Sequence, residues 1–473
     1  IRIAMTTDPH RPRFHTLPAR NWMNDPNGLI QRDGVYHLFY QYNPDGPWHG
    51  NIHWGHARSD DLVRWEELPV ALYPTPGSPD AGGCWSGCAI DLGEQVALLY
   101  TGFDMGAQRP CLAYGDADLI TWRKHPGNPV IAGPPPGLDT LGFRDHSVWR
   151  EDGQWYQAIG SGIRGKGGTA LVYRSTDLLS WEYLHPLADE DIHQRFPLFT
   201  GLIWECPNLF PLGDRHVLLV SAWRPAGLEY VAAYVGELRE QRFTPRSLVK
   251  LDGGDHCYYA PQTLLDARGR RLIWGWLQEE RDREAQIAAG WSGMMSLPRV
   301  LSLDAASGLR MAFAPELEGL RGAGARWTGL RVDEDRLVML DVSDGDQCEL
   351  GLTIEAGETG ETRLHVRRSP DGREDTLIGI DWARKTLFVE RARSSLNPRA
   401  EPGRREIGLA GGADRACVMR VFVDHSVLEV CVNDQAWISC RVYPELADSV
   451  GIGLSSVGAT SWVASVEHWA CGL

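Results

Sequence analysis

A repeated phrase, Asp-Leu-x-x-Trp, sets the strongest limit on how this chain can fold. It occurs at residues 61–65, 118–122 and 177–181, at intervals of about 57 and 59 residues. Such intervals are too long for helical solenoids and close to the longer propeller-blade repeats. The phrase therefore predicts a fold built from similar units of about 60 residues.

A second feature recurs in the same frame and extends the repeat to five units. Short runs of aromatic and β-branched residues follow turn residues, with starts about 55 to 62 residues apart. Each run is typical of a strand, and one repeat has room for about four strands. We therefore expect a five-bladed β-propeller over residues 1–315. A large β-sandwich with accidental repeats is the alternative, although a sandwich requires no fixed period. The runs are Val35–Tyr40, Val96–Tyr100, Trp155–Ile159, Val217–Val220 and Leu272–Trp276.

The sequence pattern changes after residue 315. Residues 316–326 are rich in Gly, Glu and Arg, which predicts a short helix or linker. From Trp327 onward apolar and polar residues alternate, as in Arg420–Val432, and turn signals such as Asp371-Gly372 separate the runs. We therefore expect an all-β chain: a five-bladed β-propeller followed by a C-terminal β-sandwich over residues 327–473.

Composition and charge narrow the class of partner. A length of 473 residues exceeds what one core usually supports, so two domains are expected. The formal net charge of −15 opposes nucleic acid and anionic membranes, and there is no long apolar stretch of transmembrane type. The 19 Trp outnumber the 11 Phe and 14 Tyr, and this surplus fits either repeated core packing or a carbohydrate site, where flat aromatic faces meet sugar C–H groups. A small carbohydrate is thus one partner that the composition fits, and the oligomeric state is not predicted.

Cysteine usage and the N-terminus bear on metals and location. Of ten Cys, only Cys84 and Cys88 lie close together, and neither a second pair nor a His cluster completes a zinc pattern. Buried free thiols are therefore expected, with no metal and no cofactor. Residues Ile1 to His10 lack the apolar core of a signal peptide, which favours a cytoplasmic location. A processed, secreted form stays open.

Three acidic residues fall at one phase of the repeat. Asp25 and Asp145 lie ten residues before the recurring run of their repeat, and Glu205 lies twelve before it. Ser86 occupies the same place in the second repeat. All four residues are thus expected on the strand that precedes the recurring run. In a propeller this is the first strand of the blade, which lines the central channel. The three carboxyls are therefore expected to converge.

The surroundings of two of these acids suggest different roles. Asp25 lies among amides in Asn21–Gly28, which favours an ionised nucleophile. Glu205 lies between Trp204 and Cys206, where burial would raise its pKa and suit a proton donor. Two carboxyls with diverging pKa values are the working pair of glycoside hydrolysis. Alone, however, Asp-Pro-Asn-Gly is usually a turn, and channel strands also carry structural acids.

These segments resemble the motifs of glycoside hydrolase family 32, which includes invertases, sucrose-6-phosphate hydrolases, levanases and inulinases. Asn24–Gly28 is similar to the family's nucleophile motif. Arg144-Asp145 is similar to the motif whose Asp holds fructose hydroxyls and stabilises the transition state. Glu205-Cys206 is similar to the acid/base motif. The resemblance runs from about Arg13 to the C-terminus and implies a propeller followed by a sandwich.

The resemblance also implies an activity and a set of sugar contacts. It implies a retaining β-fructofuranosidase that releases terminal β-D-fructosyl groups from sucrose or short fructo-oligosaccharides, with carboxyls about 5–5.5 Å apart. For Gln41 and Trp276, core packing is the alternative. His146 stands where the family usually has Pro, and could add a hydrogen bond or a titrating charge. The implied substrate-binding residues are Asn24, Gln41, His49, Trp85, Ser86, Arg144, His146 and Trp276, beside catalytic Asp25, Glu205 and Asp145.

Several other functions fit the same sequence. A fructosyltransferase, or an enzyme that degrades levan or inulin, would use the same scaffold. A carbohydrate-binding propeller would not need a proton donor, and a protein scaffold would hydrolyse no sugar. The sequence alone does not separate hydrolysis from transfer.

Overall fold

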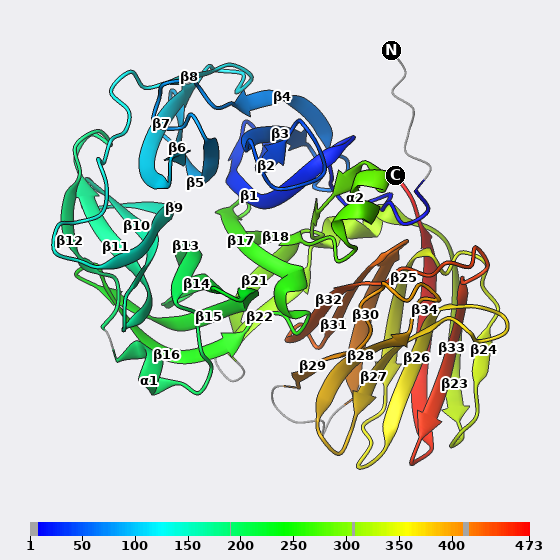
Figure 1. Cartoon of the computed structure of the whole chain (residues 1–473). Helices are drawn as coiled ribbons and strands as arrows, with labels where there is room; N and C mark the ends of the chain where they lie inside the picture. The colour runs from blue at the N-terminus through cyan, green and yellow to red at the C-terminus, as the bar shows by residue number, and fades with distance from the viewer. Residues whose placement is uncertain (1–7, 190, 305–307, 410–415) are drawn as a thin grey trace.

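The computed structural model describes residues 8–189, 191–304, 308–409 and 416–473, and these are almost entirely β-structure. Five sheets, antiparallel except for one short parallel pair in the first, surround a common centre, and two further sheets form a layered body beside them (Figure 1). The expected five-bladed propeller followed by a β-sandwich is thus confirmed. The prediction of a cytoplasmic location rested on residues 1–10, and residues 1–7 of this segment lie outside the described residues.

Each blade places its strands from the centre outward in chain order. The second strands contain all five predicted runs. The innermost strands are β1 (Asn21–Arg32), β5 (Gly83–Asp91), β9 (Thr140–Glu151), β13 (Ile203–Leu212) and β17 (Tyr258–Leu265). The second strands are β2 (Val35–Asn43), β6 (Val96–Asp104), β10 (Gln154–Ile163), β14 (Arg215–Arg224) and β18 (Arg271–Leu277). The outer pairs are β3 (His53–Ser59) and β4 (Glu66–Leu72), β7 (Ala107–Gly115) and β8 (Trp122–Lys124), β11 (Gly167–Ser175) and β12 (Glu182–Pro186), β15 (Gly227–Arg239) and β16 (Arg242–Lys250), and β21 (Arg299–Asp304) and β22 (Gly308–Phe313).

The Asp-Leu-x-x-Trp phrase forms the same turn between the third and fourth strands of the first three blades. In the first blade, Asp61 accepts two hydrogen bonds from backbone N–H groups just after it, at 2.9 and 2.7 Å. The Trp65 indole donates to the carbonyl of Leu62, whose φ is 66°. Trp122 and Trp181 make the equivalent bond at 2.9 and 2.8 Å. The repeat is therefore a turn that side-chain hydrogen bonds hold in a left-handed conformation.

Short helices interrupt the propeller where the sequence predicts none. They are α1 (Ile192–Arg195), η1 (Asp255–Cys257) and α2 (Arg283–Ala289). The side chain of Asp282 caps α2 by accepting from the N–H of Ala285, and Gly290 ends it with a φ of 75°. Helices this short show too few turns for a periodic pattern. After α2, β19 (Trp291–Ser292) pairs in parallel with β1, and β20 (Met294–Met295) pairs with β18, which joins the last blade to the first.

The segment between the two bodies differs in part from the predicted linker. A short 3-10 helix, η2 (Pro315–Leu320), occupies its first half. Its second half, residues 321–326, is not a linker but the start of β23 (Arg321–Val332), which pairs with β34 (Ser461–Cys471). The Gly and Arg residues of this segment have weak β-propensity, so the sequence did not predict a strand here. The strand forms because the segment pairs with β34.

The second body is a sandwich of two six-stranded sheets. Its core is a cluster of buried aliphatic side chains from both sheets, which includes Leu350, Val421, Ile378 and Leu454. The first sheet has the order β23-β34-β25-β30-β31-β32, with β25 (Gln347–Ile354), β30 (Cys417–Asp424), β31 (Val427–Val432) and β32 (Ala436–Arg441). The second has the order β24-β33-β26-β27-β28-β29: β24 (Val338–Leu340), β33 (Gly451–Val457), β26 (Glu361–Arg368), β27 (Asp375–Asp381), β28 (Thr386–Arg393) and β29 (Arg404–Gly408).

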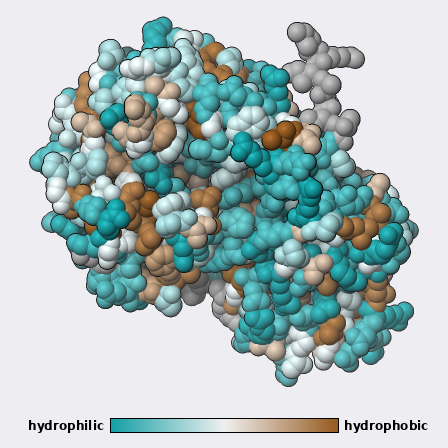
Figure 2. All heavy atoms as spheres, in the orientation of Figure 1, coloured by the Kyte–Doolittle hydropathy of each residue, from teal (hydrophilic) through white to brown (hydrophobic). Residues whose placement is uncertain are grey.

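A buried interface joins the propeller to the sandwich. Phe313 packs against Phe422 and Trp437 of the sandwich, with ring centroids 4.7 and 4.5 Å apart. Arg299 of β21 reaches Glu429 of β31 through an ion pair inside the interface. Outside it, hydrophilic side chains cover much of the surface seen in Figure 2. No helix in the described ranges is long and apolar enough to cross a membrane.

Candidate active site

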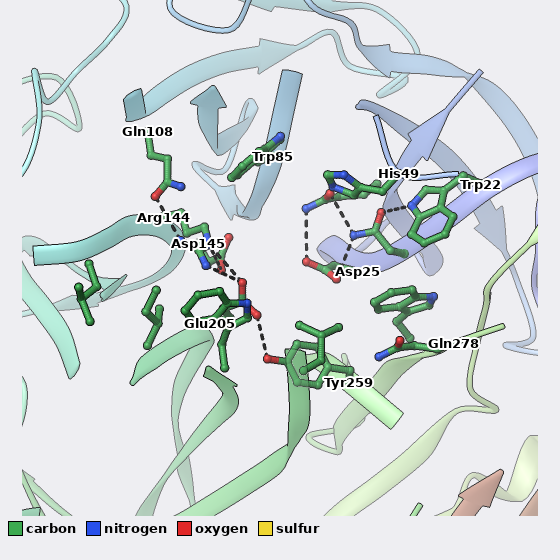
Figure 3. A pocket seen from close by; sticks show the side chains of 17 residues that line it. Trp22, Asp25, His49, Trp85, Gln108, Arg144, Asp145, Glu205, Tyr259 and Gln278 are labelled. Atoms are coloured by element: carbon green, nitrogen blue, oxygen red, sulfur yellow. Dashed lines mark hydrogen bonds and ion pairs between the residues drawn. The ribbon is translucent and has the colours of Figure 1, made fainter. Parts of the chain in front are cut away.

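A cavity of about 630 Å³ lies at one end of the innermost strands (Figure 3). All five blades contribute to its wall, and the three acids of the repeat face it from blades one, three and four. The expected convergence of Asp25, Asp145 and Glu205 on one cavity is therefore observed. The wall consists of Trp22, Asn24, Asp25, Gln41, His49, Trp85, Gln108, Leu141, Arg144, Asp145, Ile203, Glu205, Trp223, Leu228, Tyr259, Trp276 and Gln278.

A bulge interrupts each innermost strand at the level of the cavity. The register with the second strand skips Asn24-Asp25, Ser86, Asp145, Cys206-Pro207 and Ala260-Pro261 in blades one to five. Three of these bulges hold a left-handed residue with a φ between 46° and 63°. Because a bulge re-aims side chains and bends its strand, this repeated irregularity turns the acids toward the channel axis.

Asp25 accepts hydrogen bonds on both carboxylate oxygens. The Ser86 hydroxyl donates to Oδ2 at 2.6 Å, the Asn24 amide donates to Oδ1 at 3.1 Å, and the Cys206 thiol approaches Oδ2 at 3.5 Å. Burial outweighs these bonds and, with the nearby charge of Glu205, raises the pKa of Asp25 to about 6. The pKa of Asp25 is therefore higher than its amide neighbours alone would give, because burial and the charge of Glu205 oppose them.

Glu205 faces Asp25 across the cavity and is held at both oxygens (Figure 3). The Arg144 guanidinium donates to Oε1 at 2.6 Å, and the Tyr259 hydroxyl donates to Oε2 at 2.8 Å. The side chain of Glu205 keeps 16% of its surface exposed, against 6% for Asp145. Glu205 is thus fixed in orientation yet reachable from the cavity.

Asp145 is the most enclosed of the three acids. The backbone N–H of Cys206 donates to its Oδ2 at 2.9 Å, and Arg144 Nε lies 4.0 Å from the same oxygen. Burial raises the pKa of Asp145 to about 7; Arg144 opposes this rise, and the charges of Glu205 and Asp25 add to it. Glu205 and Asp145 thus share one arginine, and Asp25 lies close enough to feel their charges. The titrations of Asp25 and Asp145 are therefore coupled, and near neutral pH this pair retains protons that isolated carboxyls would release.

Most of the predicted sugar-binding residues lie in the cavity wall. Asn24, Gln41, His49, Trp85, Arg144 and Trp276 line it. Ser86 does not: it is fully buried behind Asp25, where its hydroxyl bonds the carboxylate. It is therefore placed to act on Asp25 rather than on a sugar.

His146 is also outside the cavity, contrary to the prediction. It is buried, with Nδ1 3.2 Å from Gln157 Oε1 and Nε2 3.1 Å from Thr101 Oγ1. Burial lowers its pKa to about 3, so it carries no charge at neutral pH. The bulge at Asp145 leaves His146 in regular pairing with Ile159, and its ring packs behind the channel wall. Of the two roles considered for His146, the hydrogen-bonding one agrees with these contacts, since Thr101 also accepts from the N–H of Asp145 at 3.0 Å, whereas a titrating charge does not.

The sequence predictions missed several residues of the wall. Tyr259 lies on the innermost strand of blade five, at nearly the same phase as the three acids, so the repeat frame could have revealed it. Gln108 lies on the third strand of blade two, where its Oε1 accepts from Arg144 at 3.3 Å and from the N–H of Phe143 at 2.8 Å. Trp22, Trp223 and Gln278 also line the cavity, and no local pattern marks the last two.

One group within the described ranges could hold a metal ion, and it lies outside the cavity. His256, Glu280 and Glu401 bring ligand atoms within 4.8 Å of one another. Arg391 and Arg405 already pair with both glutamates, which neutralises the charge a cation would need. All ten cysteines are free, and all but Cys88 are buried.

Comparison with known proteins gives consistent matches over the whole chain. The model of the glycosyl hydrolases family 32 N-terminal domain matches residues 15–315, and that of the family's C-terminal domain matches 316–470. A sucrose-6-phosphate hydrolase of Zymomonas mobilis is 33% identical over 97% of this chain and 91% of its own length. Beta-fructofuranosidase 1 of Zea mays is 31% identical over 92% of this chain and 75% of its own length. The crystal structure of fructan 1-exohydrolase IIa from Cichorium intybus superposes with a TM-score of 0.89 at 27% identity, covering 98% of both chains.

Proposed function

The chain belongs to glycoside hydrolase family 32, and from this premise we propose that Asp25 and Glu205 perform a double displacement on terminal β-D-fructosyl groups. The protein is a β-fructofuranosidase with a small carbohydrate substrate. One observation supports the choice of residues most strongly: carboxyls from three separate blades line a single cavity, and one arginine, Arg144, lies among them.

In the first step, Asp25 is the nucleophile. Its carboxylate attacks the anomeric C2 of the fructosyl group while the bond from C2 to the leaving oxygen breaks. Glu205 protonates that oxygen, and Arg144 and Tyr259 hold the Glu205 carboxyl in place. The hydrogen bonds from Ser86 and Asn24 orient Asp25 for attack.

In the second step, the covalent fructosyl-enzyme is hydrolysed. Glu205, now deprotonated, takes a proton from a water molecule that attacks C2, and the ester bond to Asp25 breaks. Two inversions give net retention at C2. Asp145 stabilises the developing oxocarbenium ion through the ring hydroxyls, and its restricted exposure keeps bulk water from competing for those contacts.

Sucrose and short fructo-oligosaccharides are the substrates we propose. The relatives include a sucrose-6-phosphate hydrolase and a β-fructofuranosidase, and a cavity of about 630 Å³ suits a few sugar units. The tryptophans Trp22, Trp85 and Trp276 offer flat faces to sugar C–H groups. A cytoplasmic location, which would favour small transported sugars over polymers, stays a prediction.

A panel of substrates tests this proposal. Fructose release is measured from sucrose, sucrose 6-phosphate, 1-kestose, inulin and levan, for the wild type and for Glu205→Gln. We expect fastest release from the short sugars, and a loss of about 10²–10⁴-fold in the variant. With methanol as acceptor, retention predicts a methyl β-fructofuranoside; the α-anomer, or wild-type rates in Glu205→Gln, would refute the assignment. Larger fructans as the main products from sucrose would instead indicate a transferase.

A further inference from the structure

A second cavity lies farther along the same five innermost strands. Its volume is about 290 Å³. Every innermost strand contributes residues that follow its active-site residues: three or more positions after Asp25, Trp85, Glu205 and Tyr259, and two after Asp145. The cavity is therefore coaxial with the active site and opens at the other end of the propeller channel. It is lined by Leu29, Ile30, Gln31, Cys88, Ala89, Asp91, Ser147, Val148, Asn208, Leu209, Phe210, Gln262, Thr263, Leu264, Leu265 and Arg271.

Arg271, the first residue of β18, gives this cavity a positive charge without a counter-charge. Its Nε is buried and has no hydrogen-bond partner, and no carboxylate among the described residues lies within ion-pair distance of its guanidinium. The guanidinium stacks over the Phe210 ring at 4.8 Å from the centroid. Burial alone lowers the pKa of Arg271 to about 10. A partly buried cation in this state lacks the partner that buried charges normally have.

Other enclosed arginines of the chain show what is missing here. Arg144 pairs with Glu205 at 2.6 Å, and Arg441 pairs with Glu279 at 3.0 Å. One acid, Asp91, does line the second cavity, but Arg32 lies 3.5 Å from its carboxylate. Arg11 also makes no ion pair among the described residues, but its Nη2 donates a hydrogen bond to the carbonyl of Pro18 at 2.6 Å. Within the described ranges, the Arg271 guanidinium has neither an ion pair nor a hydrogen bond from its Nε.

We propose that this cavity is a binding site for a small oxyanion of the phosphate class, with Arg271 as its principal ligand. The planar guanidinium presents several N–H donors in a fork that matches phosphate oxygens. Ser147 and Asn208 line the same cavity. The Asn208 amide donates to the Ser147 hydroxyl oxygen at 3.5 Å, which leaves the hydroxyl proton and the second amide proton as further donors. The volume admits inorganic phosphate or the phosphate end of a sugar phosphate. The anion would complete the ion pair that the protein leaves open.

Binding of inorganic phosphate to the whole protein tests the proposal. Isothermal calorimetry at constant ionic strength, with chloride as the replaced anion, measures the affinity for the wild type, for Arg271→Gln and for Arg239→Gln. Arg239 is a matched control because its side chain is 81% exposed and pairs with Glu237. We expect saturable binding in the wild type and in Arg239→Gln, and at least tenfold weaker binding in Arg271→Gln. No saturable binding in the wild type, or equal affinity in Arg271→Gln, would overturn the proposal.

Two further arms make the result decisive. If Arg271→Gln fails to fold, Arg271→Lys replaces it: a lysine keeps the charge but loses the fork, so weaker binding supports the site and unchanged affinity overturns it. Fructose 6-phosphate in place of phosphate identifies the source of the anion, since tighter binding indicates a sugar phosphate and weaker binding indicates free phosphate. Asp25→Ala should bind phosphate as the wild type does, which separates this site from the catalytic cavity.

Discussion

Two buried charge clusters of this protein behave in opposite ways. At the interface between propeller and sandwich, His15 lies between Asp424 and Glu429 at 2.8 and 2.9 Å, and Arg299 pairs with Glu429. Although burial opposes charge there, these contacts raise the pKa of His15 to about 9 and lower those of both acids. In the catalytic cavity burial prevails and raises the pKa values of Asp25 and Asp145.

The difference lies in the partners, not in the depth of burial. Asp424 accepts from the backbone N–H groups of Arg13, Phe14 and His15 besides its contact with the His15 ring. Asp25 receives neutral donors and faces the like charge of Glu205, while Arg144 is shared with two other acids. A fully paired cluster fixes two bodies together, whereas an underpaired one holds protons near neutral pH and is ready to exchange them.

The largest expected effect comes from removing the nucleophile. Asp25→Ala should lower kcat by roughly four to six orders of magnitude, because no other group can form the covalent intermediate. The fold should persist, since the change removes a desolvated charge that the native state tolerates poorly. Steady-state sucrose hydrolysis with a circular-dichroism melt checks both. Asp61→Ala, an acid of a surface turn, is the control and should keep its turnover. Comparable activity in Asp25→Ala and Asp61→Ala would contradict the assignment of Asp25 as the nucleophile.

The interface cluster should respond in stability rather than in rate. Arg299→Met removes the buried cation that pairs with both Glu429 and Asp252 and leaves Glu429 with His15 alone, so it should reduce the free energy of unfolding by about 3–5 kcal/mol. Urea denaturation measures the loss. Arg384→Met, which breaks an exposed pair with Glu406, is the matched control, and its loss should be below about 1 kcal/mol. Equal losses would mean that the interface pairing contributes no more than a surface pair.

The raised pKa of His15 gives the interface a defined pH dependence. A His whose folded-state pKa lies above its unfolded value of 6.5 stabilises the fold fully below pH 6.5, and this contribution is lost as pH rises through about 9. Between these two pH values, the free energy of unfolding of the wild type should therefore fall by up to about 3 kcal/mol more than that of His15→Gln. Denaturation curves at several pH values test it. A parallel pH dependence in the two proteins would show that His15 is not charged in the fold.

The smallest expected effect is a shift of the pH–rate profile. Because Asp25 must be ionised to attack, kcat/KM should fall as pH drops through about 6. Ser86→Ala removes a hydrogen bond that lowers the pKa of Asp25, so this acid limb should move upward by about half a pH unit to one unit. Initial rates at low substrate across pH 4 to 9 would show it. A limb that stays in place would exclude Ser86 from tuning Asp25.

The repeat explains why the propeller fold and the convergence of the three acids could be predicted from the sequence. A nearly constant phase placed Asp25, Asp145 and Glu205 on innermost strands, because each blade repeats one strand order. The phase could not show the bulges, which decide that Asp145 enters the cavity while His146 packs behind it. A local pattern gives strand and phase, but the direction of a side chain depends on the neighbouring strand.

The interface and the second cavity lie beyond such reasoning for another reason. His15 meets Asp424 across nearly the whole length of the chain, and nothing near either residue marks the partner. Arg271 is unusual through the absence of a nearby carboxylate among the described residues, which only the arrangement in space reveals. Contacts between residues far apart in the chain leave no periodic pattern in the sequence, so the sequence alone does not predict them.

Trapping the covalent intermediate tests the central claim most directly. β-D-Fructofuranosyl fluoride needs no proton to leave, so Glu205→Gln should form the fructosyl-enzyme and then stall, because no base activates water. Peptide mass spectrometry after an acid quench should find one fructosyl group on Asp25, and none in the double variant Asp25→Ala/Glu205→Gln. A fructosyl group on Asp145, or on any residue other than Asp25, would contradict the account.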